Sequence, residues 1–401
     1  MEFDDVLALD TEAGRAALAA ATDLPDGDPL AAASALRTRG FAPALAAAAL
    51  TQAALRRRAA AKFGPDAAVM LFTRAGLEQA TRAPVARRRA ERLAAAGARR
   101  IADLGCGIGA DTIAFARAGL QVLAVDASPA TAAVAEANVR ALHLADSVHL
   151  EARDATEVPL DAVDAVFCDP ARRTSGGRRV FDPRAYSPPW EFVAGLAQRV
   201  PLAALKLAPG IDHDLLPAGA EGEWVSVDGD VVEAAAWCGP LAAAPRRATV
   251  LRGDEAHELT GTGAERAPAG PVGGYLYDPD GAVVRAHLVA ELAESLDGRL
   301  LDETIAYVTA DVARATPFAR CYAIEERLPI ALKKLRAALR SLDVGSLQIL
   351  KRGSAHDVED LRRQLRLEGS RDAVLALTRI AGDPAALLLR SVGARAVAAG
   401  R

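Results

Sequence analysis

Asp103-Leu104-Gly105-Cys106-Gly107-Ile108-Gly109 puts three glycines directly after a short apolar run. The run 100–104 has the composition of a strand and 111–118 that of a helix, so we expect the glycines to form the turn between them. Glycine lets a backbone pass close to a ligand, and the first turn of a helix has free N–H groups. The turn therefore predicts a site for the polar groups of a ligand.

Strands and helices alternate beyond this turn. Residues 129–143 have a helical pattern, and strands are expected at 121–126, 147–152, 162–168, 203–207, 223–227 and 231–237. Alternation at this spacing is typical of βαβ units around a parallel sheet. The last two strands, joined by Asp228-Gly229-Asp230, predict a hairpin.

Four strand ends carry an acid: Asp103, Asp126, Asp154 and Asp169. Gly105, Gly107 and Ala110 satisfy a dinucleotide fingerprint, and Asp126 follows at about the expected 20-residue distance, where it can accept from a ribose diol. Three features favour S-adenosylmethionine instead. Asp103 can pair with a cationic amino group, Asp154 suits an adenine amino group, and Asp169-Pro170 closes the fourth strand.

As a set, these acids resemble class I S-adenosylmethionine-dependent methyltransferases over about residues 99–238. The resemblance implies an α/β, Rossmann-like, seven-stranded sheet and S-adenosyl-L-methionine as cofactor, with the hairpin supplying the antiparallel strand. It also implies that the turn residues Gly105, Cys106, Gly107 and Gly109 line the methionine and ribose. Asp103 would hold the ammonium, Asp126 the ribose hydroxyls and Asp154 the adenine.

Methyl transfer is an in-line displacement that needs a nucleophile lone pair aimed at the methyl group. Amino-methyltransferases of nucleic acids orient an exocyclic amine with a (D/N)PP(Y/F/W) turn, whose aromatic ring stacks on the base. Here the turn reads Asp169-Pro170-Ala171-Arg172-Arg173. Asp169 and the Pro170 carbonyl fit as acceptors, and Arg172 stands where the aromatic is missing, able to stack or to bind phosphate. Asp169 as a structural turn residue is the alternative.

A second stretch, Ser187-Pro188-Pro189-Trp190, looks like the missing aromatic motif. No strand leads into it, and we expect it to start a helix. A stacking ring can still come from this loop, at Phe181, Tyr186 or Trp190. Asp-Pro-Ala-Arg also occurs in uracil-C5 RNA methyltransferases, but no nucleophilic cysteine follows strand 203–207, which disfavours that chemistry.

Residues 1–98 are rich in Ala, Leu and Arg, which predicts an N-terminal helical region. Its segment 72–86 resembles the one upstream of trimethylguanosine-synthase-type enzymes, where a Thr-Pro-Glu turn covers the cofactor's carboxylate. Thr81 would match that threonine. A plain helix cap at Thr81 is the alternative.

Taken with the stretches 205–210, 328–335 and 349–353, the whole chain resembles bacterial methyltransferases with a C-terminal THUMP-like domain. Domains of this type bind RNA in other tRNA-modifying enzymes, so the resemblance implies an RNA substrate. We expect a methyltransferase domain at 99–240, a linker and sheet extension at 241–320, and a small α/β THUMP-like domain at 321–401. Strands are expected at 275–276 and 282–284, and helices at 286–296 and 328–341. Lys333, Lys334, Lys351 and Arg352 are candidate phosphate contacts, with a solvated charged face as the alternative.

The 401 residues carry a net charge of −4, so the whole chain is not a basic nucleic-acid coat. Four separated cysteines without CxxC spacing indicate neither a zinc site nor a redox pair. Neither a signal peptide nor a membrane span is visible, which predicts a cytoplasmic protein. The expected function is methylation of an exocyclic amine of an RNA base. A methyltransferase for a small molecule or protein and a non-catalytic RNA-binding module are the alternatives.

Overall fold

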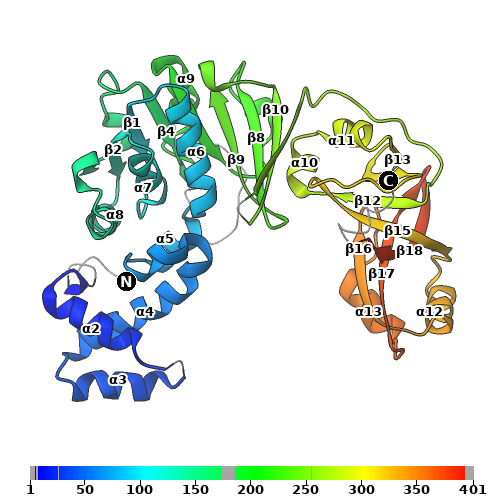
Figure 1. Ribbon diagram of the computed structural model, residues 1–401, viewed down its shortest axis with the longest axis horizontal. Coiled ribbons are helices and arrows are strands. Elements are labelled where there is room, and N and C mark those ends of the chain that lie inside the picture. The colour runs from blue at the N-terminus through cyan, green and yellow to red at the C-terminus, as the bar shows by residue number, and fades with distance from the viewer. Residues whose placement is uncertain (1–4, 6–7, 26, 173–185, 254, 393–401) are drawn as a thin grey trace. The chain divides into compact units, whose positions relative to one another are not determined.

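Helices fill the chain before the first strand, as its composition predicts (Figure 1). They are α2 (Glu12–Thr22), α3 (Pro29–Thr38), α4 (Pro43–Phe63), η1 (Gly64–Ala68), α5 (Arg74–Gln79) and α6 (Ala83–Ala95). The side chains of Thr11 and Asp28 cap α2 and α3 by accepting from backbone N–H groups of the first turn. The buried side chains of this region pack with Ile108 and Val134 of the following segment in one core.

This computed structural model describes residues 5, 8–25, 27–172, 186–253 and 255–392. Two compact units divide the chain. The first comprises Met1–Glu221 and Ala235–Ala243, and the second Gly222–Ala234 and Ala244–Arg401.

A mixed sheet follows the helices, in the strand order β11-β10-β8-β9-β7-β4-β1-β2-β3. Its strands are β1 (Arg100–Leu104), β2 (Gln121–Asp126), β3 (Val148–Ala152), β4 (Ala165–Cys168), β7 (Leu202–Leu207), β8 (Glu221–Val227), β9 (Asp230–Cys238), β10 (Arg246–Arg252) and β11 (Glu255–Gly261). The run from β3 to β7 is parallel. The α/β fold class is thereby confirmed, and β10 and β11 extend the sheet beyond the seven expected strands.

The predicted hairpin is present between β8 and β9. Its two turn residues, Asp228 and Gly229, have φ angles of 53° and 94°. Positive φ at both central residues matches the right-handed twist of the two strands. Sequence alone therefore places this turn to within one residue.

Helices α7 (Ala110–Arg117), α8 (Pro129–Ala141) and α9 (Trp190–Arg199) connect the strands. Leu93 of α6 and Phe115 of α7 share a core with Phe167 and Trp237 of the sheet. Short 3-10 turns lie at η2 (Ala145–Ser147), η3 (Ala155–Glu157), η5 (His213–Leu215) and η6 (Gly239–Leu241). Beyond β4, a two-stranded ribbon pairs β5 (Ala171–Arg172) with β6 (Tyr186–Ser187).

The second unit contains a seven-stranded sheet in the order β13-β14-β12-β15-β18-β17-β16. Its elements are β12 (Tyr275–Pro279), α10 (Gly281–Arg285), α11 (Val289–Ser295), β13 (Arg299–Asp302), β14 (Ile305–Ala310), β15 (Ala319–Leu328), α12 (Leu332–Ser341), β16 (Val344–Lys351), α13 (Val358–Leu365), β17 (Arg371–Ile380) and β18 (Asp383–Ser391). Buried leucines of α12 and α13 pack in one core with leucines of β17 and β18.

Two details of this unit differ from the sequence expectations. Residues 282–284 lie in helix α10, not in a strand, because Asp280 caps the helix by accepting from the N–H of Ala282 at 2.9 Å. The start of the helix expected over 328–341 is wrong, because Leu328 ends strand β15 and α12 begins at Leu332. Within the described part of the chain, none of the helices has the length and apolar character needed to cross a membrane.

Asn138 joins α8 to two segments of the first unit. Its fully buried side chain accepts from the N–H of Leu71 at 2.6 Å, and donates to the carbonyls of Leu71 and Ile108 at 3.0 and 2.9 Å. We predict that Asn138→Ala lowers the free energy of unfolding by about 3 kcal/mol, because it leaves buried backbone groups unpaired. Urea unfolding measures this. Glu136→Ala, at an exposed position of the same helix, is the control, and an equal loss in both variants contradicts the assignment.

Candidate active site

The glycine turn brings the ends of β1 and β4 into contact. Gly105 has a φ of 86°, and a Cβ built on it would lie 2.7 Å from the carbonyl oxygen of Asp169. The N–H of Asp169 donates to the carbonyl of Leu104 at 3.1 Å. Gly109 caps α7 in the left-handed conformation, with a φ of 90°. Only glycine satisfies both the conformation and the close approach at position 105.

Asp126, at the end of β2, is held by the same turn. Its Oδ2 accepts from the N–H of Gly107 at 3.1 Å and its Oδ1 from the N–H of Ser128 at 2.9 Å. Burial raises the pKa of this half-buried carboxyl. Each oxygen keeps a further lone pair, so the carboxylate is able to accept from a pair of neighbouring hydroxyls.

Asp103 is completely buried at the end of β1. Its Oδ2 accepts from Thr112 Oγ1 at 2.5 Å, whereas Oδ1 has no hydrogen-bond partner among the described residues. Burial raises the pKa of Asp103 to about 8, and the neighbouring Asp111 adds to the rise. A buried acceptor without a donor fits a cationic group, so these residues suit the ammonium of S-adenosylmethionine.

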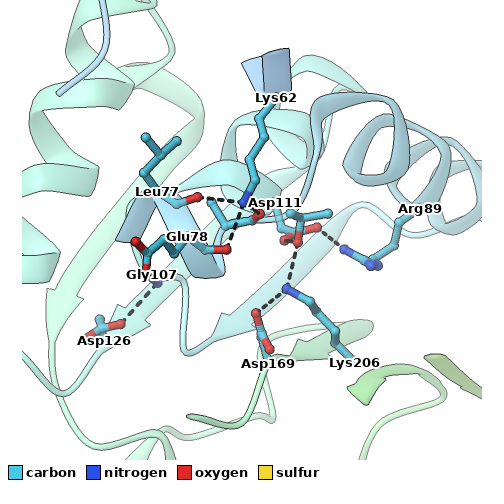
Figure 2. Close-up of polar contacts among 11 residues, drawn as sticks. Lys62, Leu77, Glu78, Arg89, Gly107, Asp111, Asp126, Asp169 and Lys206 are labelled. Atoms are coloured by element: carbon cyan, nitrogen blue, oxygen red, sulfur yellow. Dashed lines mark hydrogen bonds and ion pairs between the residues drawn. The ribbon is translucent and has the colours of Figure 1, made fainter. Parts of the chain in front are cut away.

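Charged and polar side chains of the first unit form a connected chain that includes Asp169, Lys206, Asp111 and Arg89 (Figure 2). Lys206 of β7 donates from Nζ to Asp169 Oδ2 at 2.7 Å and to Thr81 Oγ1 at 3.0 Å. Thr81, which is buried, donates in turn to Asp111 Oδ2 at 2.6 Å. Asp111 also pairs with the buried guanidinium of Arg89, which lies 4.4 Å from the centre of the Phe167 ring.

Sequence reasoning found Thr81 and Asp169 in this chain but missed the other three members. Lys206 carried a usable signal, because it is the single charged residue of the strand Leu202–Leu207. The sequence around Asp111 and Arg89 gives no such signal, because each residue lies in an ordinary helical segment. Their pairing depends on how α6 packs beside α7.

Lys62 holds the backbone that leads to Thr81. Its Nζ donates to the carbonyls of Leu77, Glu78 and Ala80 at 2.6, 2.9 and 3.1 Å (Figure 2). Burial lowers the pKa of this lysine. These bonds satisfy carbonyls at the C-terminal end of α5, which have no partners within the helix itself.

The other predicted cofactor residues lie around the glycine turn. Asp154 follows β3, whose Ala152 pairs with Asp126, and its exposed carboxylate caps η3 by accepting from the N–H of Thr156 at 2.8 Å. Cys106 is buried within the turn, and burial raises the pKa of its thiol well above the usual range. Burial likewise raises the pKa of Cys168, so neither thiol is activated as a nucleophile.

The predicted substrate-side residues are partly described. Pro170 is buried, and Arg172 pairs through its backbone with Tyr186 in the β5–β6 ribbon. The side chain of Arg172, and Phe181 as a whole, lie outside the described residues. Trp190 begins α9, as expected, and its half-buried ring meets the buried Tyr186 ring edge-on at 6.1 Å. No metal-holding group of three or more His, Cys, Asp or Glu side chains occurs in the part of the chain that is described.

The candidate phosphate contacts of the second unit differ in their surroundings. Lys333 and Lys334 of α12 are exposed, with no ion-pair partner among the described residues. Lys351 donates to the carbonyl of His356 at 3.0 Å. Arg352 donates from Nε and Nη2 to Asp278 Oδ1 at 3.0 and 2.9 Å. The charge of Arg352 is therefore already compensated within the fold.

Three family models match this chain. They are a methyltransferase domain at residues 101–174, a THUMP domain-like model at residues 319–391 and a domain of unknown function (DUF8688) at residues 2–59. Two proteins of Mycobacterium tuberculosis, from strains CDC 1551 and H37Rv, are each described as an uncharacterized S-adenosylmethionine-dependent methyltransferase. Each is 38% identical over 347 residues, which is 81% of this chain and 90% of the relative.

One solved structure resembles the chain over almost its whole length. It is a crystal structure from Porphyromonas gingivalis W83, provisionally described as a methyltransferase. It covers 98% of this chain and 100% of its own, with a TM-score of 0.73 and 21% identity. At this identity the likeness supports the fold alone.

Fold, glycine turn and relatives together define a class I methyltransferase rather than a dehydrogenase. The chain belongs to the S-adenosylmethionine-dependent methyltransferases, and its cofactor is S-adenosylmethionine. In particular, it is a methyltransferase that carries a C-terminal THUMP-like domain.

The buried Asp103 predicts how stability depends on pH. Between pH about 4 and about 8 the folded protein keeps a proton on Asp103 that the unfolded chain has released, so the free energy of unfolding falls as pH rises and levels off above about 8. Asp103→Asn imitates the protonated carboxyl and should remove most of this fall. Urea midpoints from pH 5 to pH 9 measure it. Equal slopes in parent and variant contradict a proton on Asp103.

Proposed function

We propose that this enzyme transfers a methyl group to an exocyclic amine of an RNA base. The observation that carries the proposal is the Asp169 carboxylate at the end of β4. Lys206 occupies its Oδ2, its Oδ1 has no hydrogen-bond partner among the described residues, and its side chain is 34% exposed. An acceptor fixed on one side and open on the other suits a substrate N–H group.

Bound S-adenosylmethionine supplies a methyl group activated by a sulfonium centre. Asp169 Oδ1 and the Pro170 carbonyl accept the two N–H groups of the amine, which turns the nitrogen lone pair away from conjugation with the ring. A carboxylate at this position also favours the positive charge that develops on the nitrogen. Arg172 is the third residue that we assign to the substrate side, to bind phosphate.

The cofactor side follows from the positions described above. Asp103 Oδ1 takes the ammonium, Asp126 the ribose hydroxyls and Asp154 the adenine amino group. The turn residues Gly105, Cys106, Gly107 and Gly109 line the methionine and ribose, with the N-terminal end of α7 beside them. Thr81 would lie beside the cofactor's carboxylate, and its hydroxyl is held by Lys206 and Asp111.

We assign base stacking to Trp190. In the ribbon, Ala171 pairs with Ser187 and Arg172 with Tyr186. Continuing this antiparallel register sets Pro188 and Pro189 alongside Asp169-Pro170, so Trp190 follows directly. Its ring is half-buried, whereas that of Tyr186 is buried. Trp190 thus stands in for the aromatic residue that the Asp169 turn lacks.

The THUMP-like match at residues 319–391 supports RNA as the substrate. Lys333 and Lys334 are two neighbouring exposed cations of this segment, with no ion-pair partner among the described residues, and they suit a phosphate backbone. The proposal includes a cytoplasmic location, because an enzyme that methylates cellular RNA has to share a compartment with its substrate.

The chemistry is tested at Asp169. We expect single-turnover methyl transfer to total cellular RNA, followed by nucleoside mass spectrometry, to show the rate order Asp, Asn, Ala. Asn still accepts through its oxygen, whereas Ala should lower the rate by a factor on the order of 10²–10³. Affinity for S-adenosylhomocysteine should change little. An Ala variant as fast as the parent removes Asp169 from the reaction, and a parent that leaves RNA unmethylated refutes the RNA proposal.

The RNA contacts are tested by charge reversal. Lys333→Glu with Lys334→Glu should weaken RNA binding and reduce the slope of log K against log salt by about 0.7 for each lost phosphate contact on a single strand. Arg57→Glu with Arg58→Glu, an exposed basic pair on α4, changes the net charge equally and is the control. Identical slopes for parent and Lys variant leave the two lysines as a solvated face.

A further inference from the structure

Lys206 is a charged residue inside an apolar strand. β7 pairs with β4, and the remaining side chains of Leu202–Leu207 are alanines and leucines. The Lys206 side chain is only 13% exposed. Withdrawing an ammonium from water is costly unless partners replace the water, and Asp169 and Thr81 do so at 2.7 and 3.0 Å.

The pairs in this network balance their charges. Asp169 pairs with Lys206, and Asp111 pairs with Arg89 (Figure 2). A substrate nitrogen that reaches Asp169 Oδ1 therefore meets a carboxylate whose charge is already compensated, because the Lys206 ammonium is hydrogen-bonded to the other oxygen of the same carboxylate. A neutral amine gains hydrogen bonds there. A protonated aliphatic amine brings a second cation close to Lys206, which like-charge repulsion opposes.

We propose that Lys206 is a positioning residue that orients Asp169 and makes the site select a neutral amine over an ammonium group. This rests on the proposed function and narrows its substrate class. Through Nζ, Lys206 leaves one oxygen of Asp169 for the substrate and fixes the direction in which that oxygen points. It also joins the substrate side to Thr81, so that both sides of the site share one donor.

A purely structural Lys206 would tie β7 to the segment before α6 and do nothing through Asp169. A double-mutant cycle separates the two roles, because a residue that acts only through Asp169 loses its effect when Asp169 is absent. The variants are Lys206→Met, Lys206→Arg, Asp169→Ala and the Met–Ala double variant. Arg117→Met, which breaks the Arg117–Asp66 pair elsewhere in the first unit, is the matched control.

We expect Lys206→Met to lower the single-turnover rate on total cellular RNA by about tenfold, with little change in the KM for RNA. In the Asp169→Ala background the same substitution should change the rate by less than about twofold. Lys206→Arg should restore most of the rate, because it keeps the charge and a donor. Arg117→Met should behave as the parent. An equal loss from Lys206→Met in both backgrounds overturns the positioning role.

Acceptor selection is tested with polylysine as the probe. We expect the parent to methylate RNA and not polylysine. In Lys206→Met, the ratio of the methylation rate on RNA to that on polylysine should be smaller than in the parent. A parent that methylates polylysine as fast as RNA overturns the selection while the RNA proposal stands. A parent that leaves RNA unmethylated refutes the RNA proposal. In that case the urea midpoints of the same four variants measure the coupling between Lys206 and Asp169. If the stability losses of the two single variants simply add in the double variant, the two residues are not coupled and the positioning role is overturned.

Discussion

The ion pair between Lys206 and Asp169 is the contact on which the arrangement of this site depends. Lys206 lies on β7 and Asp169 directly follows the neighbouring parallel strand β4, and Lys206 extends the connection through Thr81 to Asp111 at the start of α7. The charges of Lys206, Arg89 and Asp111 are largely withdrawn from water, and such charges persist only when each has a partner of opposite sign and further hydrogen bonds. The requirement is met by residues from four elements, so displacing any one of them leaves a buried charge exposed to an apolar interior. The polar chain thus fixes the relative positions of β4, β7, α6 and α7.

Asp103 differs from the acids of that chain because it forms no ion pair among the described residues. Asp111 and Asp169 are each compensated by a cation, whereas Asp103 has only the hydroxyl of Thr112. Burial and the nearby acids raise its pKa to about 8, so at neutral pH the free protein keeps this group protonated. A cationic ligand at Oδ1 would provide the missing partner and favour loss of that proton. In the proposed function, cofactor binding and the protonation of Asp103 are therefore coupled.

Local sequence patterns predicted the parts of the fold that depend on neighbouring residues. The bounds of β1 and β2 follow from apolar runs that end in glycines or an acid, and the β8–β9 turn follows from Asp228-Gly229. Residues 282–284 were assigned to a strand because Val283 and Val284 favour one, and a single cap at Asp280 was decisive instead. Strand β10 joins the sheet by pairing with β8, and β11 joins it by pairing with β10. The sequence of these two strands has no clear alternation that would predict this pairing. The positions of Asp103, Asp126 and Asp169 at strand ends were predictable, but the Lys206–Thr81 bond joins residues 125 positions apart.

Order along the chain also differs from order within the site. Pro170 and Ser187 are 17 positions apart in the sequence. At this separation, sequence alone does not indicate that Ser187-Pro188-Pro189-Trp190 lies near the Asp169-Pro170 turn. The antiparallel β5–β6 register reverses that separation, because it returns the chain along the segment that leaves β4. In the proposed function, this short ribbon brings the ring of Trp190, at the start of α9, towards Asp169 at the end of β4. In the proposed reaction, Asp169 is then bordered by Lys206 from one strand and by Trp190 from the returning ribbon. A neutral, planar, amine-bearing base satisfies the compensated carboxylate and the ring together, which neither an aliphatic ammonium nor a small saturated molecule does.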